Sequence, residues 1–298
     1  ILSGNSVQDG PALPLLRSLM PEEVLGASFR VYIGVKGDKI IKKYQHRIPR
    51  KSEGYFLKIE KDCIVIAGAD ERGAYYGVQT LAQLLALDKL PLAEVTDYPD
   101  VPYRGVVEGF YGAPWSQEAC IRQLDFYGRN KMNVYIYGPK DDPYHRTPNW
   151  RKPYPAREGE ELKVLVNRAK ENNVIFYWAI HPGQDIRWNE EDRSLLLQKF
   201  ESMYQLGVRG FAVFFDDISG EGTKADKQAE LLNYIDDHFV KVKRDVAPLI
   251  LCPTEYNKSW TDVEGGYLTT LGDKLNEGIK VMWTGDMVVA TIDKSTLD

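Results

Sequence analysis

The chain has 298 residues, of which 43% are hydrophobic and 27% are charged, as is typical of a globular protein with one large domain or two ordinary ones. Its net charge of −5 offers no basic surface for nucleic acid, and no apolar run approaches the roughly 18 residues that cross a bilayer. Three scattered cysteines and four histidines without metal-ligand spacing predict neither a disulfide framework nor a zinc site, and no metal or organic cofactor is indicated.

The first hundred residues predict a small α+β domain. Its first five residues lack the basic and apolar regions of a signal peptide, so we expect the chain either to have none or to be given in mature form. Nothing here indicates catalysis, and we expect a scaffold that ends at two prolines, Pro99 and Pro102. The predicted elements are a strand at 29–33, a hairpin formed by 54–59 and 63–67, and a helix at 70–85.

Residues 101–298 form a second predicted domain, in which apolar strands alternate with amphipathic helices. This alternation indicates a parallel sheet, and the polar or glycine-rich loops after the strands favour a (β/α) barrel. No Gly-x-Gly-x-x-Gly follows the first strand, which argues against dinucleotide binding. The predicted strands are 104–110, 132–137, 174–180, 210–215, 249–251 and 279–283, and the helices are 117–128, 160–171, 192–206, 225–242 and 268–275.

The number of strands is too small for a closed barrel. A complete TIM-type barrel has eight strands in about 250 residues, whereas this pattern provides six, with residues 288–292 expected to start the sixth helix. We therefore predict an α/β fold with a TIM-type barrel that is incomplete at its C-terminal end, in a fragment of a longer protein.

An acidic pair, Asp216-Asp217, follows the uninterrupted apolar run of the predicted strand 210–215. Asp-Asp occurs twice more: Asp141-Asp142 fits a turn or helix cap, and Asp236-Asp237 lies in a helical pattern and is expected to face solvent. The pair at 216–217 differs because ligands and catalytic groups collect at the carboxyl ends of buried parallel strands. Neighbouring residues of a regular strand point to opposite faces, so the two carboxylates share a pocket only if the strand breaks there.

The other predicted strand ends carry carboxylates, amides, hydroxyls and aromatic rings. This mixture suits a sugar, because rings stack on sugar faces and polar groups satisfy the hydroxyls. For any single aromatic residue, packing between helix and barrel is an equally good explanation.

Five segments in order resemble the catalytic barrel of glycoside hydrolase family 84, which contains the bacterial relatives of O-GlcNAcase. Residues 1–95 resemble the α+β domain that precedes the barrel in these enzymes, so the resemblance covers essentially the whole chain. The segments are 104–116 (RGVVEGFYGAPWS), 135–145 (YIYGPKDDPYH), 178–183 (WAIHPG), 215–218 (FDDI) and 252–256 (CPTEY).

The resemblance implies a retaining exo-β-N-acetylglucosaminidase in which the acetamido oxygen of the substrate acts as nucleophile and forms an oxazoline intermediate. It implies that Asp216 accepts the acetamido N–H and that Asp217 is the general acid and base. One carboxyl pKa of such a pair is expected to rise. The implied sugar contacts are Gly109 and Lys140 to hydroxyls, Tyr256 to the acetamido oxygen, and Tyr137, Cys252, Trp283 and Thr284 around the N-acetyl group.

The implied substrate is terminal β-linked N-acetylglucosamine of glycans or glycoproteins, and the resemblance favours a periplasmic or extracellular location. The natural aglycone stays open. Two alternatives also stay open: a carbohydrate-binding fragment that is inactive because the barrel is incomplete, and another hexosaminidase or hyaluronidase-like glycosidase. The Asp-x-Asp-x-Glu and Asp-Glu patterns of chitinases and family 20 hexosaminidases do not occur at 216–217.

Overall fold

The computed structural model describes residues 1–298 except 23, 25, 262–265 and 298. The chain forms two compact units that interleave along the sequence. The sequence predicts one division near residue 100, and that division into domains stays a prediction. The first unit comprises Ile1–Gly105, Ile121–Val134 and Arg168–Val174, and the second comprises Val106–Cys120, Tyr135–Asn167 and Ile175–Asp298.

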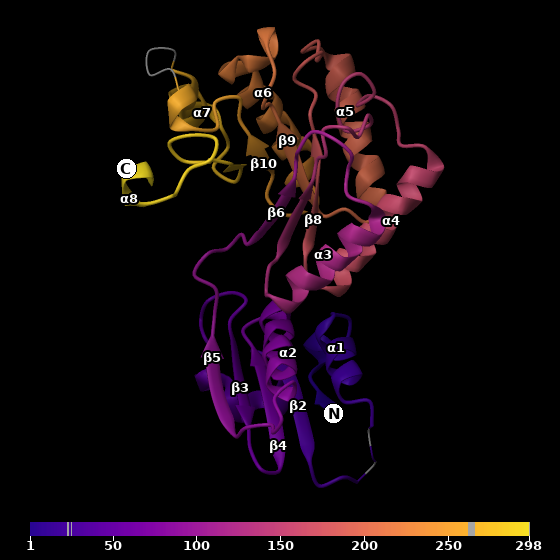
Figure 1. The fold of residues 1–298 in the computed structure, drawn as a ribbon, viewed down its shortest axis with the longest axis vertical. Helices are drawn as coiled ribbons and strands as arrows, with labels where there is room; N and C mark the ends of the chain where they lie inside the picture. Colours follow the sequence, from indigo (N-terminus) through magenta and orange to yellow (C-terminus); the bar gives the residue numbers. More distant parts are fainter. Residues whose placement is uncertain (23, 25, 262–265, 298) are drawn as a thin grey trace. The chain divides into compact units, whose positions relative to one another are not determined.

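The first unit is built on a sheet whose five strands, counted over the described residues, have the order β1-β2-β4-β3-β5 (Figure 1). The predicted hairpin is confirmed: β3 and β4 are antiparallel, with Leu57 opposite Ile66, and β2 runs parallel to β4. The elements are β1 (Leu2–Ser3), η1 (Asn5–Val7), α1 (Ala12–Leu19), β2 (Arg30–Val35), η2 (Lys39–Arg47), β3 (Tyr55–Ile59), β4 (Cys63–Gly68), α2 (Glu71–Leu85) and β5 (Ala93–Asp97).

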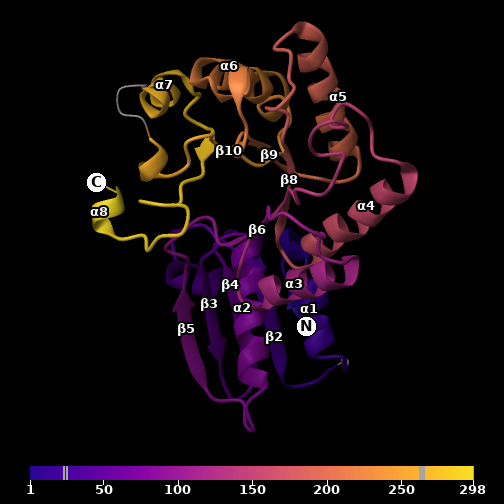
Figure 2. The same cartoon turned by 45° about the horizontal axis from the view of Figure 1, so that its top comes forward.

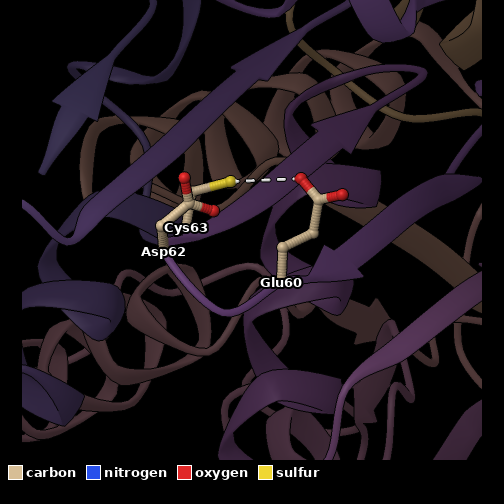
Figure 3. Close-up of side chains that lie close together, drawn as sticks. All are labelled: Glu60, Asp62 and Cys63. Carbon is tan, nitrogen blue, oxygen red and sulfur yellow. Dashed lines mark hydrogen bonds between the residues drawn. The ribbon is translucent and has the colours of Figure 1, made fainter.

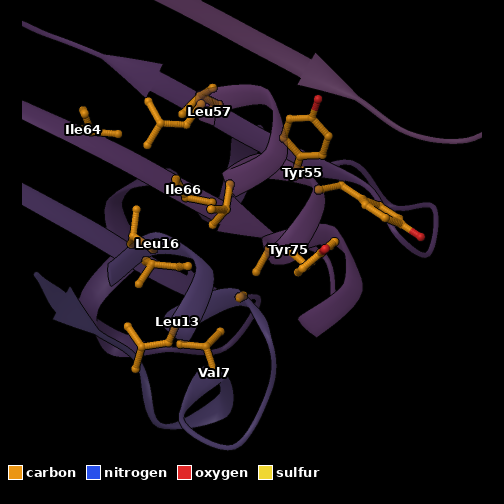
Figure 4. Close-up of a cluster of buried hydrophobic side chains, with 14 of the residues drawn as sticks. Val7, Leu13, Leu16, Tyr55, Leu57, Ile64, Ile66 and Tyr75 are labelled. Carbon is orange, nitrogen blue, oxygen red and sulfur yellow. The ribbon is translucent and has the colours of Figure 1, made fainter. Parts of the chain in front are cut away.

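Alternate residues of β4 divide the apolar core of this unit between the two faces of the sheet. Ile64 and Ile66 belong to the cluster that also contains Leu13 and Leu16 of α1 (Figure 4). Val65 and its partners form a separate cluster with residues of η2. The period of two that predicts a strand in the sequence therefore also assigns each side chain to its face.

The sequence predicts β2, β3, β4 and α2 but not β1, η1, α1, η2 and β5, and two of the unpredicted elements have a clear physical reason. Helix α1 contains Pro14, which argues against a helix. Pro14 is the third helical residue, a position where a backbone N–H would have no partner inside the helix, so the N–H that proline lacks costs no helical hydrogen bond. Strand β5 alternates half-buried and exposed residues at the edge of the sheet, and its polar composition resembles that of a linker.

The second unit contains a curved row of six strands within its described residues, in the order β11-β10-β9-β8-β7-β6. The pairs β8–β9, β9–β10 and β10–β11 are parallel, and helices α4, α5, α6 and α7 follow one another around the outside of the row (Figure 2). This arrangement confirms the predicted incomplete (β/α) barrel. The strands are β6 (Gly105–Glu108), β7 (Val134–Tyr137), β8 (Ile175–Ile180), β9 (Gly210–Phe214), β10 (Ile250–Cys252) and β11 (Lys280–Val281).

The helices lie close to their predicted positions. No helix in the described part of the chain is both long and apolar enough to cross a membrane. The helices are α3 (Gln117–Arg129), α4 (Ala156–Glu171), α5 (Glu190–Gln205), α6 (Ala225–Ile235), α7 (Tyr267–Lys274) and α8 (Lys294–Leu297), with shorter turns η3 (Gly220–Thr223), η4 (Asp236–Val240) and η5 (Lys258–Trp260).

Two sequence predictions in this unit are wrong. Residues 288–292 are not helical: Val289 is 86% exposed and Ile292 50% exposed, so burial does not stabilise a helix there. The α-helical hydrogen bonding of α6 ends at Ile235 and a π-helical turn, η4, follows. That turn contains Asp236, which is 3% exposed and accepts a hydrogen bond from Asn276 (2.8 Å) instead of facing solvent, whereas Asp237 is exposed as predicted.

Candidate functional site

The site is organised around the end of β9. All five residues of this strand are buried between β8 and β10, and the strand hydrogen bonding stops one residue before Asp216. Asp217 then adopts a φ of 53°, in the left-handed region that residues other than glycine rarely use. The predicted break of the strand at the acidic pair is confirmed.

Asp216 lies in a nearly closed environment. Its Oδ2 is 2.5 Å from Lys140 Nζ, and the two side chains are 14% and 2% exposed. Its Oδ1 lies 3.5 Å from His181 Nε2 and has no closer hydrogen-bond partner among the described residues, because that nitrogen donates to the backbone oxygen of Asp216 (2.7 Å). Burial acts to raise the pKa of Asp216, but the neighbouring His181 ring and the Lys140 ammonium outweigh it and hold this pKa well below its usual value. Asp216 is therefore ionised at neutral pH.

Asp217 is exposed and contacts a residue that sequence reasoning did not single out. The Tyr111 hydroxyl donates to Asp217 Oδ2 at 3.0 Å, and Lys140 Nζ lies 6.0 Å from the centre of the Tyr111 ring. Tyr111 therefore links the surroundings of the two carboxylates: its hydroxyl bonds to Asp217, and its ring lies near the ammonium that pairs with Asp216. Burial and the contact with Asp217 raise the pKa of Tyr111, so its hydroxyl is a proton donor at neutral pH. Tyr111 lies inside the segment 104–116, two residues after Gly109, and that position is the signal that could have identified it.

The loop that carries Gly109 and Tyr111 is fixed at both ends. Glu108, the last residue of β6, is fully buried, and its carboxylate accepts hydrogen bonds from the Trp115 backbone N–H (2.8 Å) and from the Tyr135 hydroxyl. The carbonyl of Phe110 accepts from the Lys140 N–H at 3.1 Å. These bonds bring the predicted residues Gly109 and Lys140 to neighbouring strand ends.

The ends of β10 and β11 supply four more predicted residues. Tyr256 and Thr284 are brought together by the Thr284 N–H, which donates to the Tyr256 carbonyl at 2.9 Å, and Trp283 precedes Thr284 as a half-buried residue. Burial, followed by the charges of Asp217 and Asp216, raises the pKa of Tyr256 to about 12, so its hydroxyl stays protonated. Burial also raises the pKa of the Cys252 thiol well above its usual value, so this thiol is a neutral wall and not a nucleophile.

Tyr137 is directed differently from the other predicted residues. Its hydroxyl donates to Asp142 Oδ2 at 2.9 Å, as the Tyr154 hydroxyl does at 2.7 Å. Tyr137 and Asp142 line a cavity of about 300 Å³ between the loops that follow β6 and β7 and helix α4, and the described lining residues of this cavity do not include Asp216. Asp142 thus holds side chains within the fold, as its place in a turn suggests.

One group of side chains in the first unit has the geometry of a possible metal site. The ligand atoms of Glu60, Asp62 and Cys63, at the turn between β3 and β4, lie within 4.8 Å of one another (Figure 3). Glu60 is already paired with Lys58 (2.7 Å), and burial and Glu60 raise the pKa of the Cys63 thiol, which disfavours the thiolate that a metal needs. These contacts explain the arrangement of the three side chains without a metal ion.

Comparisons with known proteins identify the family of the chain. Residues 104–298 match the family model described as beta-N-acetylglucosaminidase, and residues 32–98 match that of domain 2 of glycosyl hydrolase family 20. The protein O-GlcNAcase of Rattus norvegicus is 37% identical over 195 residues, which cover 62% of this chain and 21% of that protein.

Two solved structures resemble nearly the whole chain. The structure titled CpGH84B has a TM-score of 0.89 at 37% identity and covers 97% of this chain, and CpGH84D has 0.86 at 29% identity and covers 99%. This chain spans about half (53%) of each of those chains and about a fifth (21%) of the curated O-GlcNAcase. The family model, which matches well over half of the residues, shows that the chain belongs to the β-N-acetylglucosaminidase family, glycoside hydrolase family 84.

Proposed function

We propose that this chain carries the catalytic pair of a retaining exo-β-N-acetylglucosaminidase of the O-GlcNAc hydrolase type, which works by substrate assistance. The observation that carries the proposal is the state of Asp216. It is ionised, it is 14% exposed, and its Oδ1 accepts no hydrogen bond from the described residues, because His181 Nε2, 3.5 Å away, donates to the Asp216 carbonyl instead. A buried acceptor of this kind favours a ligand that brings an N–H group, as an acetamido sugar does.

In the first step the acetamido carbonyl oxygen attacks the anomeric carbon while the bond from that carbon to the glycosidic oxygen breaks. The electron pair of the broken bond stays on the glycosidic oxygen, which takes the proton of Asp217. Asp216 accepts the acetamido N–H and stabilises the positive charge that develops on the oxazolinium ring. The aglycone leaves as an alcohol, and Asp217 is left as a carboxylate.

In the second step water attacks the anomeric carbon, and the Asp217 carboxylate takes a proton from that water. The bond between the anomeric carbon and the oxazoline oxygen breaks, which restores the acetamido group. The two inversions give N-acetylglucosamine with the original anomeric configuration, and Asp217 is protonated again for the next turnover.

The remaining predicted residues fit binding roles in this scheme. Tyr256, whose hydroxyl stays protonated, donates to the acetamido oxygen and orients it for attack. Lys140 and the Gly109 carbonyl bind sugar hydroxyls at the neighbouring strand ends. Cys252, Trp283 and Thr284 enclose the methyl side of the acetamido group. For Tyr137 we propose only that its ring lines the same pocket, because its hydroxyl is bound by Asp142.

The test uses two β-N-acetylglucosaminides, an aryl glycoside with a good leaving group and an alkyl glycoside that needs an acid. Asp217→Asn should reduce kcat/KM for the alkyl glycoside by about 100- to 10,000-fold and for the aryl glycoside much less, because only the alkyl leaving group depends on the proton. Asp216→Asn should reduce both. Asp237→Asn is the matched control, since this second aspartate of another Asp-Asp pair is exposed and bonds to Lys241 and Asn276.

Unchanged turnover of the alkyl glycoside by Asp217→Asn would contradict the proposal. Tight binding of a thiazoline analogue without turnover of either glycoside, by the wild-type chain, would instead support the carbohydrate-binding alternative.

A further inference from the structure

The conformation of Asp217 needs support from its surroundings. A non-glycine residue with a φ of 53° is strained, and such conformations persist only where neighbouring groups fix the backbone on either side. The residues that provide this support are therefore candidates for positioning the acidic pair.

Two side chains from neighbouring strand ends hold the carbonyl groups that precede Asp217. The Thr254 hydroxyl, two residues after β10, donates to the Phe215 carbonyl at 2.9 Å. His181 Nε2, from the residue after β8, donates to the Asp216 carbonyl at 2.7 Å. The Phe215 N–H in turn donates to the Cys252 carbonyl at 2.9 Å, so the backbone immediately before Asp217 is bound from both sides.

The Thr254 hydroxyl is itself oriented by a buried network. Gln228 of α6 is fully buried, and its amide nitrogen donates to Thr254 Oγ1 (2.8 Å) and to the Gly222 carbonyl (2.7 Å). The Tyr267 hydroxyl donates to the amide oxygen of Gln228, and its own oxygen accepts the Thr254 backbone N–H at 2.8 Å.

Backbone partners fix the directions of the bonds at the two ends of this network. The Gly222 atom that Gln228 contacts is the carbonyl oxygen, so the amide nitrogen of Gln228 must face it, and that nitrogen also donates to the Thr254 hydroxyl. The hydroxyl proton of Thr254 is then free to go to Phe215 O. Gly222 also lies too close to the loop after β8 for a side chain, since a Cβ there would lie 2.0 Å from the Gly183 carbonyl. The network therefore forms hydrogen bonds on both sides of Asp217, to Phe215 at the strand end before it and to Gly222 in the turn after it.

We propose that Thr254, oriented by Gln228 and Tyr267, is a positioning residue that holds the end of β9 so that the carboxylate of Asp217 stays aligned with the glycosidic oxygen. The catalytic consequence rests on the function proposed above. The structural part, that Thr254 restrains the backbone around Asp217, does not depend on that function.

Thr254→Val removes the hydroxyl and keeps the shape of the side chain, whereas Thr254→Ser keeps the hydroxyl. Thr223→Val is the control, because it deletes the same kind of bond, from a threonine hydroxyl to the Gly220 carbonyl, without touching the strand end. Hydrogen–deuterium exchange is measured on peptides that contain residues 215–219 in the unliganded full chain, and kcat/KM is measured for the aryl and the alkyl glycoside.

We expect amide exchange at 215–219 to be about tenfold faster in Thr254→Val than in Thr254→Ser, the factor that corresponds to one ordinary hydrogen bond. We also expect Thr254→Val to lose about tenfold more kcat/KM on the alkyl than on the aryl glycoside, since a displaced acid matters only where the leaving group needs its proton. A residue with a purely structural role would lower both activities equally.

Equal exchange in the valine and serine variants overturns the proposal, and so does an equal loss on the two glycosides. If the wild-type chain hydrolyses neither glycoside, the proposed function fails, and the exchange measurement still decides whether Thr254 holds the strand end.

Discussion

The ion pair between Lys140 and Asp216 gives the sharpest prediction for stability. The charged atoms are 2.5 Å apart, and the side chains are 2% and 14% exposed, so neither charge is well solvated by water. Lys140→Met leaves the Asp216 carboxylate buried without its cation. The free energy of unfolding should fall by about 3–5 kcal/mol, the usual cost of removing one partner of a buried pair.

The double variant Lys140→Met with Asp216→Asn removes both charges, and it should regain most of the stability that the single variant loses. Lys241→Met is the control, because Lys241 pairs with Asp236 and Asp237 from a side chain that is 54% exposed, and its loss should cost less than about 1 kcal/mol. Urea denaturation at pH 7 measures all three.

The stabilisation that the Asp216 carboxylate provides should decrease at low pH. In the wild-type chain the folded pKa of Asp216 lies below the unfolded value of about 3.9, so the stabilisation is fully present above that pH and is lost as the pH falls through the folded pKa. Without the Lys140 ammonium, this pKa should rise. The difference in the free energy of unfolding between wild type and Lys140→Met should therefore have its largest value at pH 7. It should become smaller as the pH falls below about 5, because protonation removes the unpaired charge of Asp216 in the variant. A single variant within about 0.5 kcal/mol of wild type at pH 7, or a double variant no more stable than the single one, would refute this reasoning.

Three further predictions concern individual side chains. Tyr111→Phe should reduce kcat/KM by about tenfold through loss of the bond to Asp217, measured with the alkyl glycoside, and an unchanged value would exclude a role for that bond. Cys252 should resist iodoacetamide at pH 7.5, because burial keeps its thiol protonated, and mass spectrometry of the treated folded chain would reveal a reactive thiolate instead. Asp70→Ala should lower the free energy of unfolding by about 1–2 kcal/mol, because Asp70 caps α2 through the Gly73 N–H, while a value near zero would show that the cap is dispensable.

Much of the fold is predictable because it depends on local pattern. The five uniformly buried residues of β9 are a continuous apolar run in the sequence, and the alternation of β4 matches its two buried faces. Prediction fails where a local rule has an exception set by position. Pro14 is compatible with α1 because it lies in the first turn, and residues 288–292 are apolar without being buried.

The sequence predicts which strand ends carry the site residues, but it does not predict which of their side chains contact one another. Lys140 and Asp216 are 76 residues apart in the sequence, and only the order of the strands in the sheet, with β7 and β9 on either side of β8, brings them together. Tyr111 and Tyr137 both lie in segments that resemble the family, and the sequence favoured Tyr137. The structure directs Tyr111 toward Asp217 from a loop, whereas Tyr137, at the end of β7, bonds to Asp142. Side-chain direction at a strand end depends on where the strand stops, and a pattern of residue types does not determine that point.

The central claim is that the acetamido group of the substrate, held by Asp216, is the nucleophile. The measurement that tests it most directly compares kcat/KM for an aryl β-N-acetylglucosaminide with its N-trifluoroacetyl analogue. Fluorine withdraws electrons from the carbonyl oxygen, so we predict a steep loss of kcat/KM for the analogue in the wild-type chain. Equal values for the two substrates would contradict the account and would point to a carboxylate of the protein as the nucleophile.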